Sequence, residues 1–315
     1  MHSHTISKQP PRVKFAALFQ RYPRQDYREI CAYFPWGDDN NSDYADTAPD
    51  QSTTDVGSGR IRASWEQPFQ RLADLAKKEQ WSFQRNQFTT KYRNQKLPIL
   101  TNYLNYTFLR LQDLGRLAYS DNGKMMCFNT GLQTPEEKDI YAVFCRHEAP
   151  DKCQRPQWIF EMFAESYNSV LREFPTGLPE IATYMSDPSD LVFDPKLEID
   201  VNYDHMLNNQ ENKDRLPDNL KNNNRTALLA IKGSIESLRD KVLRNYKVAI
   251  PHWYNNRVQL LLPLYLTNDG VADNALIVDK DKRSRMYLAR TILTMDMAYI
   301  DARIITRPDR EWLNP

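Results

Sequence analysis

Apolar residues recur every three or four positions along several stretches of the chain, a spacing that places them on one face of an α-helix. The clearest stretch is 97–117, where Leu100, Leu104, Phe108 and Leu111 follow this period and Pro98 suits the first turn. The pattern predicts helices over about residues 65–79, 97–117, 226–246 and 295–306. Shorter apolar periods favour one helix within residues 13–22 and another over 165–174.

Other segments are rich in β-branched and aromatic residues and are bounded by polar turns, which is typical of strands. They lie near residues 124–130, 139–146, 157–164, 257–266 and 274–279, and Thr267–Gly270 is a natural hairpin connection between the last two. The strands are grouped between helices and do not alternate with them. We therefore predict the α+β class, with an antiparallel sheet of mixed-length strands packed against several helices in a single main domain.

Two polar stretches interrupt this pattern. Residues 38–63 contain several aspartates, a Gly-Ser-Gly sequence and almost no large apolar side chain. We expect them to form a flexible linker between an N-terminal segment, 1–37, and the α+β domain, 64–315. Residues 206–225 are rich in asparagine and predict a long polar loop, of the kind that is either functional or disordered.

The composition, 41% hydrophobic and 26% charged among 315 residues, is that of a globular chain with a substantial core. No apolar run approaches the roughly 18 residues of a membrane span, and the first residues lack a signal peptide's apolar region. We expect a cytoplasmic protein that does not contact membranes. Residues 221–315 carry sixteen Lys and Arg against ten Asp and Glu, which suits a phosphate-bearing partner or, more commonly, an ordinary charged surface.

Sequence motifs exclude several classes of chemistry. The nine glycines form neither a P-loop nor a dinucleotide fingerprint, and the hydrolase signatures His-Glu-x-x-His and Gly-x-Ser-x-Gly are missing. Cys145, His147 and Cys153 are close enough in sequence to suggest zinc, but no Cys-x-x-Cys pair supports them, so reduced cysteines are favoured. We predict no cofactor and no metal.

The first candidate site is a polar corner at the end of a predicted strand, Asn129, Thr130 and Gly131. Its amide and hydroxyl groups could bind a ligand, or they could form an Asx or Ser/Thr turn that merely ends the strand. The second is Asp204 beside His205, where a carboxylate could orient an imidazole for acid–base catalysis. The alternative is that both residues make ordinary loop hydrogen bonds.

Arginines supply the remaining candidates. Arg303 and Arg307 are four residues apart and would share a helix face, giving a pair suited to phosphate or carboxylate. They could instead pair with nearby acids and hold the end of the chain in place. Between 81 and 93, aromatic and basic residues alternate, which is compatible with stacking on unpaired bases. The aromatic and basic residues of this stretch are Trp81, Phe83, Arg85, Phe88, Lys91, Tyr92 and Arg93.

Several blocks of the sequence together resemble the domain of unknown function 3825 family, over roughly Leu72 to Leu313. The resemblance is carried by Leu100–Leu111, by Phe128–Leu132, by Tyr203-Asp204-His205 with Arg215 and Pro217, and by the terminal Ala298–Leu313 block. Members of this family are often fused to, or sit beside, RNA-associated modules such as LOTUS or cold-shock-like domains. The resemblance implies an RNA connection and supplies no catalytic residues.

Two hypotheses follow. In the preferred one, the chain is a non-catalytic module that binds RNA or a nucleotide in a groove. The residues expected to line that groove are Tyr103, Arg110, Asn129, Thr130, Gly131, Arg215, Arg303 and Arg307. In the alternative, it is a metal-dependent phosphoesterase or nuclease that uses Asp204 and His205, with Asp200 or Asp279 as a further carboxylate. The sequence does not specify an oligomeric state.

Overall fold

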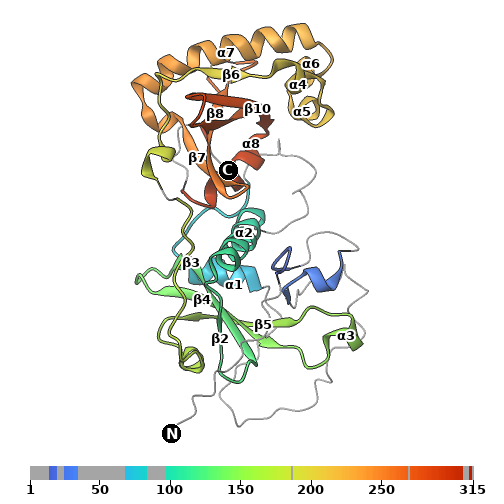
Figure 1. The fold of residues 1–315 in the computed structure, drawn as a ribbon, viewed down its shortest axis with the longest axis vertical. Helices are drawn as coiled ribbons and strands as arrows, with labels where there is room; N and C mark the ends of the chain where they lie inside the picture. Colours follow the sequence, from blue (N-terminus) through green and yellow to red (C-terminus); the bar gives the residue numbers. More distant parts are fainter. Residues whose placement is uncertain are drawn as a thin grey trace. The chain divides into compact units, whose positions relative to one another are not determined.

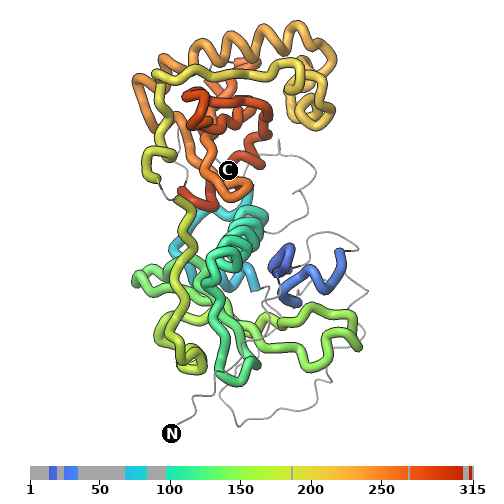
Figure 2. The backbone as a smooth tube through the Cα atoms, in the orientation of Figure 1, coloured from blue at the N-terminus to red at the C-terminus, as the bar shows by residue number. Residues whose placement is uncertain are grey.

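The computed structural model describes residues 14–19, 25–34, 68–83, 97–185, 187–268, 270–307 and 312–313. Figure 1 labels most of their helices and strands, and Figure 2 follows the same backbone as a tube. The chain divides into two compact units. Unit 1 comprises the described residues up to Lys78 together with Thr107–Ala182, and unit 2 comprises the described residues of 79–106 and from Thr183 onward.

Unit 1 is built on a five-stranded sheet with the order β1-β5-β4-β3-β2. Its strands are β1 (Ala32–Tyr33), β2 (Ala118–Tyr119), β3 (Met125–Gln133), β4 (Asp139–Arg146) and β5 (Trp158–Glu165). β1 runs parallel to β5, and the other neighbours are antiparallel. Helix α1 (Pro68–Leu75) packs against β5. The short elements of this unit are η1 (Tyr27–Glu29), α3 (Pro150–Cys153) and η3 (Ser169–Glu173).

Both faces of the central strands β3 and β4 are buried, which explains their nearly continuous apolar sequences. On one face, Phe128 stacks on Phe144 with ring centres 5.6 Å apart and also contacts Phe108 of helix α2 (Pro98–Leu114). On the other face, Cys127 and Val143 pack with residues around η3. The aromatic layer therefore holds the central hairpin of unit 1 in place.

Unit 2 contains a second five-stranded sheet with the order β6-β10-β9-β8-β7. Its strands are β6 (Ile199–Val201), β7 (Ile250–Tyr254), β8 (Arg257–Leu264), β9 (Asn274–Asp281) and β10 (Met286–Leu293). In Figure 1, the long helix α7 (Asn224–Arg244) lies along this sheet. Its buried residues Ile231 and Leu238 belong to the same core as Leu260, Val278 and Ala289 of the strands. Helix α8 (Met295–Arg303) contacts β7, β9 and β10.

The long polar loop predicted for residues 206–225 is wrong, because three short helices occupy this region. They are α4 (Tyr203–Asn208), α5 (Gln210–Arg215) and α6 (Asp218–Lys221). Two of the asparagines that suggested a loop, Asn209 and Asn223, are helix N-caps, since their side chains accept hydrogen bonds from the first turns of α5 and α7; Asn202, just before this region, caps α4 in the same way. Two 3-10 helices complete the unit, η4 (Pro188–Leu191) and η5 (Tyr246–Val248).

Other expectations have mixed outcomes. The α+β class is confirmed, with the strands divided between two mixed sheets. The helix expected within 13–22 is absent from its described part, 14–19, where Ala17 instead forms a parallel bridge with Ile30. The helix expected over 165–174 is the shorter η3. The linker expected at 38–63 and most of the basic–aromatic stretch, 84–93, lie outside the described residues.

Candidate functional site

A row of polar side chains crosses the sheet of unit 2 on the face that does not carry the α7 core. His252 pairs with Gln259, Leu260 with Val278, and Asp279 with Leu288. Because side chains alternate along a strand, Gln259 and Asp279 lie on the same face as His252, while their neighbours Leu260 and Val278 belong to the core. The two faces of this sheet are therefore chemically distinct.

This polar row forms part of a pocket of about 580 Å³, which lies within the usual range for small-molecule sites. One wall comes from α4, α5 and the cap between them, and another from α8. The first wall contributes His205, Asn209, Glu211, Asn212 and Arg215, and the second contributes Met297, Ile300 and Asp301. The end of β7 and the start of β8 add Trp253, Tyr254 and Arg257, and the middle of β10 adds Arg290.

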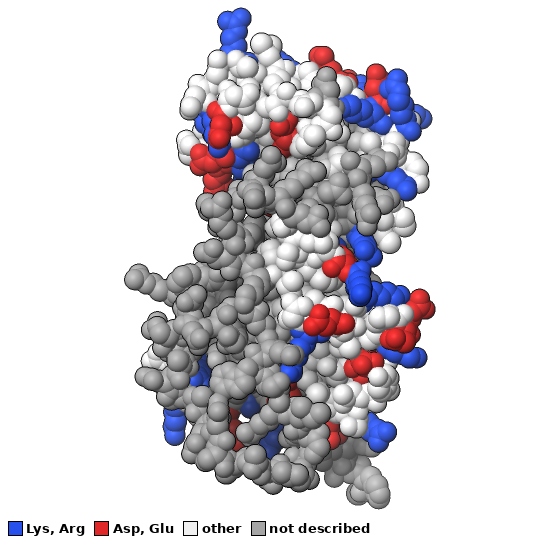
Figure 3. Space-filling view, turned by 180° about the vertical axis from the view of Figure 1, so that it is seen from behind, with Lys and Arg blue, Asp and Glu red and all other residues white. Residues whose placement is uncertain are grey.

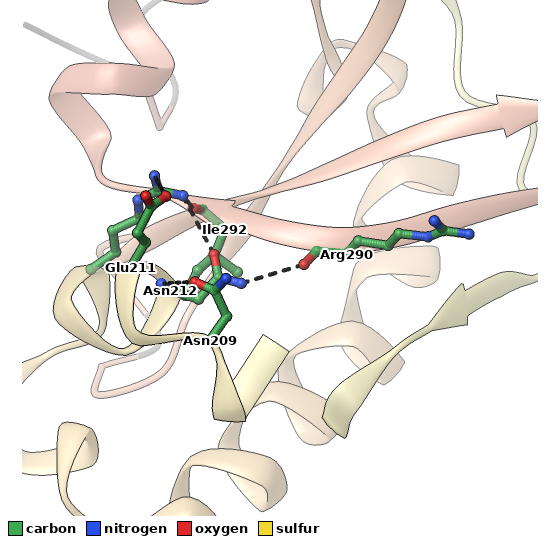
Figure 4. Close-up of polar contacts among 6 residues, drawn as sticks. Asn209, Glu211, Asn212, Arg290 and Ile292 are labelled. Atoms are coloured by element: carbon green, nitrogen blue, oxygen red, sulfur yellow. Dashed lines mark hydrogen bonds and ion pairs between the residues drawn. The ribbon is translucent and has the colours of Figure 1, made fainter. Parts of the chain in front are cut away.

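Arg215 connects helix α5, which forms one wall of the pocket, to strand β10. Its guanidinium donates to the carbonyl oxygen of Ile292 at 3.0 Å and lies 3.4 Å from the carboxylate of Glu211. Asn212, 3.4 Å from Arg215, also donates to the carbonyl oxygen of Arg290 (Figure 4). These bonds tie α5 to β10, so the described contacts of Arg215 give it a positioning role.

Arg290 and Arg257 are the exposed cations of the pocket. Figure 4 shows the Arg290 side chain extending away from the Asn212 contact, and it forms no ion pair with any described residue. Arg257 pairs with Asp279 at 2.6 Å. On the face drawn in Figure 3, acidic and basic side chains are interspersed across the described surface. Of the two exposed cations in the pocket lining, Arg290 is therefore the one without an ion-pair partner among the described residues.

His252 is the most unusual group in the pocket wall, since its side chain has 0% exposure and no described residue hydrogen bonds to either ring nitrogen. Its Nδ1 lies 4.0 Å from Oδ2 of Asp301, too far for a hydrogen bond. Burial therefore dominates and lowers the pKa of His252 to about 4. At neutral pH the imidazole is uncharged and has one donor and one acceptor to offer.

Two of the residues expected to bind ligand, Tyr103 and Arg303, do come together. Arg303 donates hydrogen bonds to the carboxylate of Glu79 from Nε and, at 2.8 Å, from Nη2. The guanidinium also lies over the rings of Tyr103 and Trp81, at 4.6 and 5.0 Å from their centres. Burial alone would lower the pKa of Arg303, but the hydrogen bonds and charge of Glu79 raise it. This arrangement favours a structural role for Arg303, and Arg307 is exposed.

The polar corner on β3 is bound internally. Thr130 donates its hydroxyl to the carbonyl oxygen of Ile140 at 2.7 Å, and Asn129 contacts Asp139 and the backbone N–H of Gly131. Gly131 has a φ of 75°, as a turn residue would. These local hydrogen bonds are those expected of an Asx or Ser/Thr turn, but they do not end the strand, because they lie at a register shift within β3, which continues to Gln133. This corner and Arg110 belong to unit 1, whereas Tyr103, Arg215, Arg303 and Arg307 belong to unit 2, so neither unit alone contains the whole expected groove.

The catalytic candidates Asp204 and His205 both lie on α4 and are exposed, and only His205 lines the pocket. Within the described part of the chain, no three His, Cys, Asp or Glu side chains are grouped so as to hold a metal ion. Sequence reasoning missed His252, Gln259 and Arg290. A signal was present only for Gln259, which alternates with Arg257 in a predicted strand, because β7 and β10, which carry His252 and Arg290, were not predicted as strands.

The architecture defines an α+β protein whose second unit has a pocket on one face of its sheet. Over residues 72–312 the chain matches the family described as Domain of unknown function (DUF3825), and it belongs to that family. No match was found among curated proteins or among solved structures. Among the described residues, every helix is too short or too polar to cross a membrane.

Proposed function

We propose that unit 2 binds a nucleotide in the pocket between α4, α5 and α8, either as a free molecule or as the terminal unit of an RNA strand. The observation that carries this proposal is His252, a buried imidazole in the pocket wall whose two nitrogens bond no described residue. Buried polar groups are normally hydrogen bonded, so an unsatisfied one at a pocket suggests a ligand that completes its bonding.

The charges of the pocket suit a ligand that carries hydrogen-bond donors as well as a small negative charge. Three arginines line it together with three acids, Glu211, Asp279 and Asp301. Arg290, with no described ion-pair partner, could receive a phosphate group, for which a planar guanidinium is well shaped. The acids could accept hydrogen bonds from ribose hydroxyls or from the amino groups of a base.

Aromatic side chains at the strand end supply surfaces for a base. Tyr254 lies at the end of β7 with 56% of its surface exposed. The neighbouring Trp253 makes an edge contact with Tyr184, with ring centres 5.5 Å apart. Stacking of one base on an exposed ring is worth about 1–3 kcal/mol. The alternative, a metal-dependent phosphoesterase centred on Asp204 and His205, is favoured by no specific contact among the described residues.

The test is a set of binding titrations with adenosine and uridine monophosphates, with single-stranded RNA carrying or lacking a 5′-phosphate, and with duplex RNA. We expect mononucleotides to bind, with affinity that falls as salt rises. Arg290→Ala should weaken phosphate-bearing ligands about 10-fold, equivalent to about 1.4 kcal/mol. Arg283→Ala, which removes an exposed charge outside the pocket, is the matched control and should bind as wild type does.

The RNA arms separate the two sources of the ligand. Tighter binding of the 5′-phosphorylated strand than of its 5′-hydroxyl form would indicate a strand terminus, and equal affinity for that strand and a mononucleotide would indicate the free molecule. Failure of every probe to bind, or identical curves for wild type and Arg290→Ala, would refute the proposal for this pocket.

A further inference from the structure

A second group of cations lies in unit 1, at the open end of the β3–β4 hairpin. Met125 pairs with Cys145, and the backbone N–H of Arg146 donates to the carbonyl oxygen of Lys124 at 2.8 Å. Lys124 and Arg146 are therefore directly opposite each other and share a face of the sheet. Like charges in that position repel each other, and neither side chain forms an ion pair with a described acid.

The pair lines a cavity of about 1000 Å³ that η1 and α3 help to enclose. Arg28 of η1 also lines it, where its Nε donates to the hydroxyl of Tyr27 at 3.2 Å and lies 4.0 Å from Asp151. Arg155 is a fourth cation in the lining and covers the ring of Tyr33. These side chains come from separate segments of the chain, so the cavity gathers positive charge that the local sequence does not reveal.

Three acids, Glu148, Asp151 and Glu173, line the same cavity and limit what it can accept. A long polyanion would bring many phosphates near these carboxylates and would be repelled by them. A single phosphate group placed between Lys124 and Arg146 would relieve their repulsion, while the rest of the molecule could donate hydrogen bonds to the acids. The lining thus fits a compact ligand that carries both a phosphate and hydrogen-bond donors.

We propose that this cavity is a second ligand site, which binds the phosphate group of a small phosphorylated molecule between Lys124 and Arg146. It is independent of the pocket in unit 2, because all its lining residues belong to unit 1. Attraction to the bound phosphate offsets the repulsion between the two cations. Because the site exists only in the folded state, the ligand stabilises that state by mass action.

The test measures thermal unfolding at low ionic strength in inorganic phosphate, in pyrophosphate, and in sodium chloride of equal ionic strength. Wild type should gain stability in the phosphate solutions beyond its gain in chloride. Arg146→Gln and Lys124→Gln should be at least as stable as wild type without phosphate, and should bind it at least 10-fold more weakly. Lys152→Gln removes an exposed charge on α3 that does not line the cavity, and should respond as wild type does.

Two further measurements, on Arg290→Ala and on single-stranded RNA, distinguish this site from the pocket in unit 2 and from a polyanion site. Arg290→Ala, in the pocket of unit 2, should retain the part of the phosphate-dependent gain that Arg146→Gln loses, so the two sites can fail separately. Equal stabilisation of wild type and Arg146→Gln by phosphate, or a wild-type gain no larger than in chloride, would overturn the proposal. Single-stranded RNA binding that depends on Arg146 without any response to phosphate or pyrophosphate would also overturn it, in favour of a polyanion.

Discussion

Acidification should destabilise this protein through His252 in a pH window that the structure defines. In the folded state burial lowers the pKa of His252 to about 4. In the unfolded chain the same imidazole has a pKa of about 6.5. Between these two values the unfolded state binds a proton that the folded state excludes. The free energy of unfolding therefore falls as the pH drops from about 6.5 to about 4, and this residue contributes no further change below that.

The magnitude follows from the gap between the two pKa values. Each pKa unit corresponds to about 1.36 kcal/mol, so full protonation of the unfolded imidazole costs the folded state about 3 kcal/mol of stability. That is a substantial share of the 5–15 kcal/mol or so that typically stabilises a folded domain. The carboxylate of Asp301, 4.0 Å from Nδ1, would act in the opposite direction, but it is not hydrogen bonded to the ring.

The assay is urea unfolding of wild type and His252→Gln at four pH values between 4.5 and 7.5. Both proteins contain the same carboxylates, so the difference between their unfolding free energies isolates His252. That difference should shift in favour of the variant by about 2–3 kcal/mol on going from pH 7.5 to 4.5. His205→Gln, which removes an exposed histidine of the same pocket, serves as the control and should track wild type within about 0.5 kcal/mol.

Parallel curves for wild type and His252→Gln across the whole range would refute the reasoning, because they would mean that His252 takes up its proton equally easily in the folded and unfolded states. A nucleotide in the pocket adds a second readout. If the nucleotide hydrogen bonds to the neutral imidazole, its affinity for the protein should decrease as the pH is lowered toward about 4, where His252 of the folded protein becomes protonated.

Three further substitutions test contacts described above. Arg303→Met should destabilise unit 2 by about 3–5 kcal/mol in chemical denaturation, because it leaves Glu79, with 7% of its side chain exposed, without its cation. Arg307→Met, at an exposed position, should change the stability little. Equal effects of the two substitutions would contradict the structural role of Arg303. Thr130→Val should cost about 1–3 kcal/mol by losing a buried hydrogen bond, measured by thermal unfolding, with a neutral result pointing to a ligand-directed hydroxyl. Gly131→Ala should cost about 1–2 kcal/mol in the same assay because of its positive φ, and an unchanged midpoint would show that the turn can rearrange.

Much of the fold could be predicted from the sequence where one periodicity dominates. Helices α2 and α7 and strands β3, β4, β5, β8 and β9 lie close to their expected positions, since each has a long apolar pattern. Strand β7 was not predicted, because His252 and an internal Pro251 obscure its alternation. Helix α5 was missed because its capping residue, Asn209, was interpreted as part of a loop, although asparagine is equally a signal for a helix start; α6 follows Pro217 and has no side-chain cap to reveal it.

The pocket could not be predicted, because it depends on register and on contacts between distant segments. His252, Gln259 and Asp279 become neighbours only when three strands pair in one alignment, and a shift of one residue would move each to the opposite face. Likewise, no local pattern indicates that Arg303 pairs with Glu79, 224 positions earlier in the chain. Residue type suggested that Arg303 binds an anion, and the fold supplies that anion from its own sequence.

The alternation along β8 and β9 also bears on how members of this family can diverge. Substitutions at positions such as 259 and 279 change what the sheet presents to a small molecule, while the intervening positions 260 and 278 keep the hydrophobic layer beneath α7 intact. Ligand preference can therefore change from one homologue to another while the fold is kept. A screen that randomises only the pocket-facing positions should yield many folded proteins with altered ligand preference.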